Sequence, residues 1–202
     1  KLKKAGLDCV FLQFDGTNDK IYEQIRGTAL LELKEAAIRH CAENEIGVVL
    51  VSTLVPGINT DNIGDLINYA VQKIPDVRAV HFQPMGYLGR YPKAPRDEDR
   101  FTIPEVIRAL ESQTGGKVKM ANFLPPAGEN AHCSFHGNFI LMPDGTLKSW
   151  VSDLSGYYGA KTEPSREGST HARNFMAKQW SAPKARPQSI QRLKEAQEVN
   201  PE

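Results

Sequence analysis

Three apolar runs of the sequence, residues 8–14, 48–55 and 77–83, carry polar side chains at or near their carboxyl ends. These polar side chains are Gln13, Asp15, Ser52, Thr53, His81 and Gln83. Amide, hydroxyl, carboxylate and imidazole groups supply both donors and acceptors of hydrogen bonds, so together they could line a site for a polar small molecule. The pattern leaves a second interpretation open, in which they satisfy loop amides and His81 is a hydrogen-bonded core residue.

A second candidate for chemistry is the segment 132–136, in which His132, Cys133 and His136 carry groups that bind zinc and iron. In an extended strand, the two histidines would lie about 13 Å apart on one face and the cysteine on the other. A metal site would therefore need a bend in the backbone and a further ligand, for example from Cys9 or Cys41. The spacing favours a structural cysteine and two polar histidines over a metal site. Glycine-rich phosphate loops, dinucleotide fingerprints, His-Glu-x-x-His and Gly-x-Ser-x-Gly are all absent from the sequence.

The three apolar runs are typical of strands, and apolar residues at helical spacing fill the segments between them. Helices are expected on both sides of Gly27, with Thr28 as the cap of the second, and again over residues 63–74. Strands separated by helices of this length predict right-handed crossovers and a parallel sheet. The polar strand ends should then face away from the outer helices.

The later part of the chain predicts a small α+β extension. Thr102-Ile-Pro-Glu105 has the pattern of a capping box that begins a helix, and Pro143-Asp-Gly145 lies between two strand-like runs, as in a hairpin. A last helix is expected up to Trp180. We expect βα units over residues 1–90, the extension over 91–180, and a mobile tail over 181–202.

Composition excludes several classes of protein. The chain has 202 residues with 25 Lys and Arg against 24 Asp and Glu, a balance that gives no sign of a nucleic-acid or anionic-lipid partner. No apolar run reaches the roughly 20 residues of a membrane-spanning helix. Its three cysteines are widely spaced, which argues against a disulfide framework and favours a cytoplasmic location.

Five segments, taken together, carry a resemblance to a known family. They are Asp8-Cys-Val-Phe-Leu-Gln-Phe-Asp-Gly16, Tyr22-x-x-Ile-Arg-Gly27, Leu50-Val-Ser-Thr-Leu-Val-Pro-Gly-Ile-Asn59, Ile63-Gly-Asp65 and Val80-His-Phe-Gln-Pro84. From about residue 8 to residue 180, the chain resembles the later half of a radical S-adenosylmethionine enzyme. It is most similar to the branch of the molybdenum-cofactor biosynthesis enzymes, the tetraether lipid synthase-like proteins and the bacterial selenoprotein-linked proteins.

The resemblance implies an α/β fold: a three-stranded parallel half of a partial (β/α)6 barrel of the TIM type, with the runs above as barrel strands four to six. It also implies that the strand ends bind S-adenosylmethionine, which a 4Fe-4S cluster on a Cys-x3-Cys-x2-Cys loop reduces to a 5′-deoxyadenosyl radical. The cofactor-binding positions it implies are Gln13, Asp15, Ser52, Thr53, Asn59, Phe82, Gln83 and Met85. The substrate, a small or lipid-like molecule, and the reaction type stay open.

The cluster loop is absent from this sequence, so the cluster is expected only in a full-length protein and the chain should be inactive alone. Residue 1 is Lys rather than Met, which we take as a hint of missing upstream sequence. Strand 8–14 would then be an open edge, and we expect it to pair with another chain or a rearranged segment. Two competing interpretations are a non-catalytic ligand-binding or scaffold fragment and a metal-binding α/β module centred on Cys133.

Overall fold

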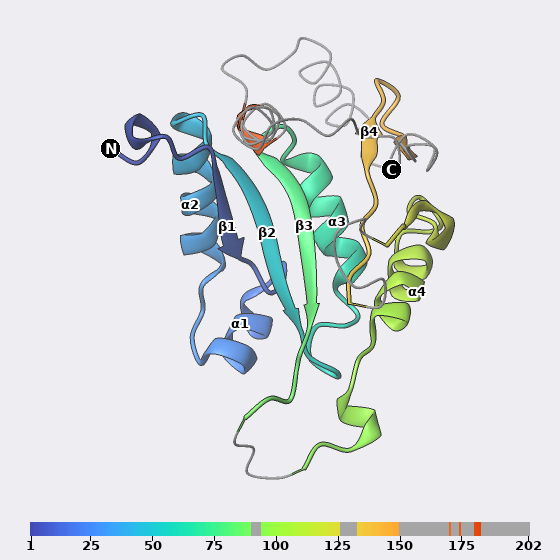
Figure 1. The fold of residues 1–202 in the computed structure, drawn as a ribbon. Coiled ribbons are helices and arrows are strands. Elements are labelled where there is room, and N and C mark those ends of the chain that lie inside the picture. The colour runs from blue at the N-terminus through green and yellow to red at the C-terminus, as the bar shows by residue number, and fades with distance from the viewer. Residues whose placement is uncertain (90–93, 126–132, 150–169, 171–173, 175–179, 183–202) are drawn as a thin grey trace.

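The structure is a computed structural model that describes residues 1–89, 94–125, 133–149, 170, 174 and 180–182. Its centre is a parallel sheet with the strand order β1 (Cys9–Gln13), β2 (Gly47–Leu54) and β3 (Val77–Pro84) (Figure 1). The three apolar runs of the sequence are thus three neighbouring parallel strands, as predicted. The fold is α/β and is compatible with part of an α/β barrel.

Four α-helices are described, α1 (Asp19–Arg26), α2 (Leu31–Glu43), α3 (Ile63–Gln72) and α4 (Ile103–Gln113). Short 3₁₀ turns occupy Lys3–Ala5, Asp97–Asp99 and Met120–Asn122. The prediction that Thr28 caps the second helix is wrong. The carboxylate of Asp19 instead accepts hydrogen bonds from the backbone amides of Leu30 and Leu31, at 2.9 Å each, so a residue of the preceding helix satisfies the start of α2.

Helices α2 and α3 lie along the same side of the sheet (Figure 1). One face of each strand packs against them, because alternate strand residues are apolar and point to that side. The resulting core cluster contains Phe14, Ile38, Val48, Leu50, Leu66, Ala70 and Val77, all buried. This is the helix-covered face of the sheet.

The opposite face of the sheet carries the polar residues. Gln13 of β1 pairs with Val51 of β2, and Val51 pairs with His81 of β3, which gives one row of side chains. Two residues nearer the carboxyl ends, Thr53 pairs with Gln83 and gives a second row. Residues paired in this way share one face of a sheet, so five side chains form two adjacent rows. We call this the open face, because Gln13, His81 and Gln83 on it are exposed in the described part of the chain.

The predicted hairpin is confirmed: β4 (Phe139–Leu141) and β5 (Leu147–Ser149) pair antiparallel around the turn at Pro143-Asp-Gly145. The predicted capping box is also confirmed, since the Thr102 amide donates to the Glu105 carboxylate at 2.6 Å. Helix α4 and the hairpin contribute to a second apolar cluster beside Leu54 at the end of β2.

The chain returns to the start of the sheet at residues 180–182. Ala182 is buried, and the backbone of Trp180 approaches Gly47 so closely that a Cβ at Gly47 would clash with its carbonyl group. Most of the predicted last helix and residues 183–202 of the predicted tail lie outside the described residues. Within the described part, no helix combines the length and hydropathy needed to span a bilayer.

Candidate functional site

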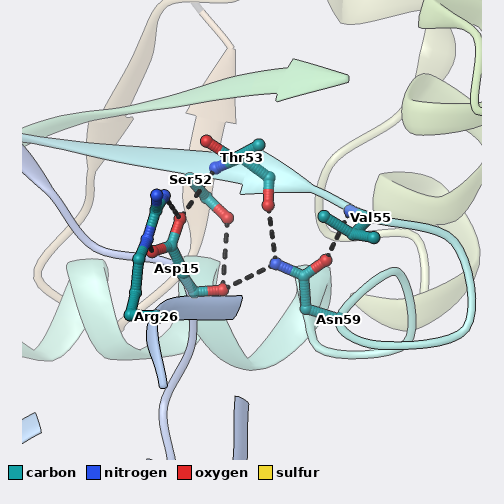
Figure 2. A network of polar contacts seen from close by, with 6 residues as sticks. All are labelled: Asp15, Arg26, Ser52, Thr53, Val55 and Asn59. Atoms are coloured by element: carbon teal, nitrogen blue, oxygen red, sulfur yellow. Dashed lines mark hydrogen bonds and ion pairs between the residues drawn. The ribbon is translucent and has the colours of Figure 1, made fainter. Parts of the chain in front are cut away.

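Asp15 follows the carboxyl end of β1, and its side chain is 1% exposed and hydrogen-bonded through both carboxylate oxygens. Its carboxylate accepts hydrogen bonds from Nε and Nη2 of Arg26, at 2.9 and 3.2 Å, and from the Thr53 amide at 3.1 Å. Figure 2 shows the guanidinium of Arg26 facing this carboxylate. Charge-assisted, two-point contacts of this kind fix a buried carboxylate strongly. Asp15 therefore ties β1 to the end of α1 and to β2, and its oxygens are already used.

Asn59 fixes the loop after β2 against the same point. Its side-chain amide donates to the carbonyl groups of Asp15, at 2.9 Å, and Thr53, at 2.8 Å, while its oxygen accepts from the Val55 amide at 2.8 Å (Figure 2). The hydroxyl of Ser52 also donates to the Asp15 carbonyl, at 3.3 Å. Asn59 and Ser52 are 0% exposed, so their roles in this structure are to satisfy buried backbone groups.

A parallel arrangement holds the loop after β1 to the start of α3. The amide oxygen of Asn62 accepts from the Thr17 backbone at 3.0 Å, and its nitrogen donates to the Thr17 hydroxyl at 2.9 Å and to Asp65 at 2.8 Å. The loops at the carboxyl ends of β1 and β2 are thus joined by two asparagines, Asn59 and Asn62. Rigid loops at this edge keep the strand ends in place.

Tyr22 of α1 is buried beneath the same edge. Its ring meets Phe14 edge to face, with 6.2 Å between centroids, and burial raises the pKa of its hydroxyl far above the usual range. The phenol is therefore un-ionised at any physiological pH and packs as part of the core.

The predicted site residues divide among the open face, the buried network at the strand ends and the core. Gln13, Thr53 and Gln83 lie on the open face together with His81, and Met85 follows β3, where its amide extends the ladder to the Leu54 carbonyl at 3.0 Å. Asp15, Ser52 and Asn59 form the buried network at the strand ends. Phe82 packs into the core on the helix-covered face. The structure thus brings four of the singled-out polar side chains onto one open surface.

Arg26 is the residue that the sequence-based prediction missed. It stands in the last turn of α1, in the quoted segment Tyr22-x-x-Ile-Arg-Gly27, and Gly27 leaves the helix with a φ of 78°. A basic residue in a last helical turn is ordinary, so only its position before a C-cap glycine and near Asp15 could have indicated its role.

The candidate metal segment does not gather ligands in the described residues. His132 lies outside them, whereas Cys133 and His136 are both exposed, and the backbone of His136 pairs with that of Leu124. Within the described ranges, no three His, Cys, Asp or Glu side chains lie close enough to hold a metal ion.

The side chains on the open face can bind a ligand, but they do not supply a group that would catalyse a reaction on it. Amides, a hydroxyl and an imidazole supply hydrogen bonds in both directions, and the half-buried Val51 gives an apolar floor between them. Asp15 is bound by Arg26 and Thr53, so it is not free to act as a base here. Chemistry at this face would need a reactive group that the ligand brings with it.

Comparisons with known proteins support the radical S-adenosylmethionine superfamily as the class to which the sequence points. The supporting match is to the 7,8-dihydro-6-hydroxymethylpterin dimethyltransferase of Methanocaldococcus jannaschii, 41% identical over 128 residues. The aligned segment covers 62% of this chain and 25% of that protein, so the chain spans about a quarter of its relative's length. No protein-family model matches the chain.

Proposed function

We propose that this chain is the part of a radical S-adenosylmethionine methyltransferase that binds S-adenosylmethionine and faces the substrate. The observation that carries the proposal is the open face, where polar side chains stand in register at the carboxyl ends of parallel strands. Ligands of parallel α/β proteins bind at this edge. The similarity to a pterin dimethyltransferase agrees with methyl transfer to a heterocyclic substrate.

In this proposal, Thr53, Gln83 and Met85 contact S-adenosylmethionine at the strand ends. Gln13 stands one row below them and reaches the same molecule. Asp15, Ser52 and Asn59 act indirectly, because their hydrogen bonds hold the ends of β1 and β2 in register. Phe82 supports Gln83 from the core side.

The residues present do not fit a 4Fe-4S cluster. Cys9 and Cys41 are half-buried, burial raises the pKa of both thiols, and Cys133 is exposed elsewhere in the chain. A cluster needs thiolates that converge on it, and thiols with raised pKa values are poor ligands. We therefore place the cluster, and with it the radical chemistry, on residues outside this sequence. Anaerobic iron-sulfur reconstitution of the chain should give no brown chromophore, and a stoichiometric one would contradict this placement.

In the described part of the chain, the outer edge of β1 has no strand beside it. We propose that β1 pairs there with a further strand of a (β/α)6 barrel or with a second copy of the chain, since open edges are usually covered.

The alternative function, a ligand-binding fragment without catalysis, is favoured by the same lack of converging cysteines and predicts identical binding by this chain.

Calorimetric titration of the 202-residue chain with S-adenosylmethionine tests the proposal. Gln83→Leu should weaken binding about tenfold, which corresponds to the loss of one or two hydrogen bonds. Gln72→Leu is a matched control, because Gln72 is an exposed glutamine at the end of α3 and lies away from the open face. Absence of binding by the unmodified chain, or equal effects of the two variants, would contradict the proposal.

A further inference from the structure

Phe11 is an unusual residue on the open face. It lies on β1 two residues before Gln13, on the same side of the strand, and is 68% exposed, whereas the neighbouring aromatic residues Phe14 and Tyr22 are 0% exposed. An exposed aromatic ring on a sheet gives a flat apolar surface at little conformational cost. The ring of Phe11 lies next to the row formed by Gln13, Val51 and His81, on the side nearer the amino ends of the strands.

Two hydrogen-bonding side chains flank an apolar position in that row. Gln13 and His81 lie on the outer strands on either side of Val51, so their backbone positions are about 10 Å apart, or two strand spacings. Val51 is half-buried and both flanking side chains are exposed. A flat molecule resting over Val51 would therefore meet a polar side chain at each end.

The part of the open face around Phe11, Gln13 and His81 favours an uncharged ligand, because the charged Arg78 lies one row nearer the start of the sheet, where its Cγ is 3.0 Å from an ideal Cβ on Gly47. Asp, Glu, Lys and Arg are absent from the in-register positions Phe11, Gln13, Val49, Val51, Thr53, Ala79, His81 and Gln83. A charged ring would lose hydration here without an opposite charge to replace it. A primary amide donates and accepts at once, and so does a neutral imidazole, which suits a ring whose edges alternate donors and acceptors.

We propose that Phe11, Gln13 and His81 bind the substrate ring, a flat, uncharged, fused-ring heterocycle of the pterin kind, an inference that rests on the proposed function. The ring stacks against Phe11 over Val51, and Gln13 and His81 hydrogen-bond its two ends. The row nearer the carboxyl ends, with Thr53 and Gln83, is left for S-adenosylmethionine, and Gln13 lies between the two ligands and contacts both. The two ligands would then lie on adjacent rows of the same face.

The test measures binding of 6-hydroxymethylpterin to the 202-residue chain through the intrinsic fluorescence of the pterin. Phe11→Ala should weaken binding at least tenfold, as expected when a stacking ring is lost. Gln13→Leu and His81→Leu should each weaken it about fivefold to tenfold, and Phe11→Tyr should restore most of the affinity. Leu33→Ala is the control, because Leu33 is similarly exposed, at 65%, on α2. Circular dichroism checks that each variant is folded.

Separate titration with S-adenosylmethionine distinguishes the possible failures. If the chain binds S-adenosylmethionine but pterin binding is absent or insensitive to Phe11→Ala, the inference is overturned and the proposed function stands. If the chain binds neither molecule, both fail. If Phe11→Ala changes only the sedimentation coefficient and leaves pterin affinity intact, Phe11 belongs to a protein interface and the inference is likewise overturned.

Discussion

The two faces of the central sheet differ sharply although the same strands form both. On the helix-covered face, Phe14, Leu50 and Leu54 are 0% exposed and pack against helices. On the open face, Phe11, Gln13 and His81 are exposed. Adjacent residues of one strand therefore have different roles: one packs in the core, and the next is accessible to a ligand.

Stability and ligand recognition reside on different faces of the sheet. Burial of apolar side chains on the helix-covered face supplies the free energy of folding. The network around Asp15 and Asn59 joins the two faces at the carboxyl edge, since it fixes strand ends whose open side stays accessible. Changes to the two faces should accordingly have separable effects.

The largest effect is expected from Leu50→Ala on the helix-covered face. Leu50 is completely buried in β2, so the variant should lower the free energy of unfolding by about 3 kcal/mol. Val51→Ala, at the next residue on the open face, should lower it by less than about 1.5 kcal/mol. Urea unfolding at equilibrium measures both, and equal losses would break the distinction between the faces.

The next largest effect should come from Arg26→Ala at the junction of the faces. Removal of the guanidinium leaves the carboxylate of Asp15 buried without its cation, which should cost about 2 kcal/mol, reduced from a fully buried pair because Arg26 is 32% exposed. The double variant Asp15→Asn with Arg26→Ala should lose less than the sum of the single changes. Additive losses would show that the pair is not coupled.

A smaller effect is expected at the capping box of α4, the helix that packs near the end of β2. Thr102→Ala should lower the free energy of unfolding by about 1 kcal/mol at neutral pH. The Thr102 hydroxyl and amide hold the pKa of Glu105 below its usual value, so this stability is present above the unfolded pKa and is lost as the pH falls through the folded one.

Glu105→Gln provides the control for this pH dependence. The substitution removes the titrating group while keeping a hydrogen-bond acceptor, so the urea midpoint of the variant should vary less between pH 3 and pH 6, a window that contains the usual glutamate pKa of about 4.3. The same slope in both proteins would show that Glu105 does not contribute to it.

The smallest effect should come from the open face itself. His81→Ala and Gln83→Ala replace exposed side chains of the open face, so each should change the free energy of unfolding by no more than about 0.5 kcal/mol. A loss above 1 kcal/mol would mean that these side chains hold the fold together and are not kept for a ligand. Thermal unfolding followed by circular dichroism gives the values.

The sequence predicted the strands and their faces because the evidence for both is local. Alternation in β1 places Leu12 and Phe14 in the core and leaves Phe11 and Gln13 outside it, as the structure shows. The length and branching of the run 48–55 predict a largely buried strand, and most of β2 is buried. Parallel order followed from the helices between the runs.

The parts of the site that could not be predicted depend on contacts between distant residues. The bond from Arg26 to Asp15 needs the end of α1 to fold back on β1, and the capping of α2 by Asp19 needs the turn between two helices. Ser52 and Thr53 are both polar, and only the register shows which one faces the helices. Such choices are set by tertiary packing rather than by local pattern.

The most direct test of the central claim is a titration of the isotopically labelled 202-residue chain with S-adenosylmethionine, followed by nuclear magnetic resonance. We predict shifts in the backbone signals of Gln13, Thr53 and Gln83 that saturate together, with the amides of Ile38 and Ala70 on the covering helices unchanged. Shifts confined to the helices, or no saturable shift at the strand ends, would contradict the claim that the open face binds this cofactor.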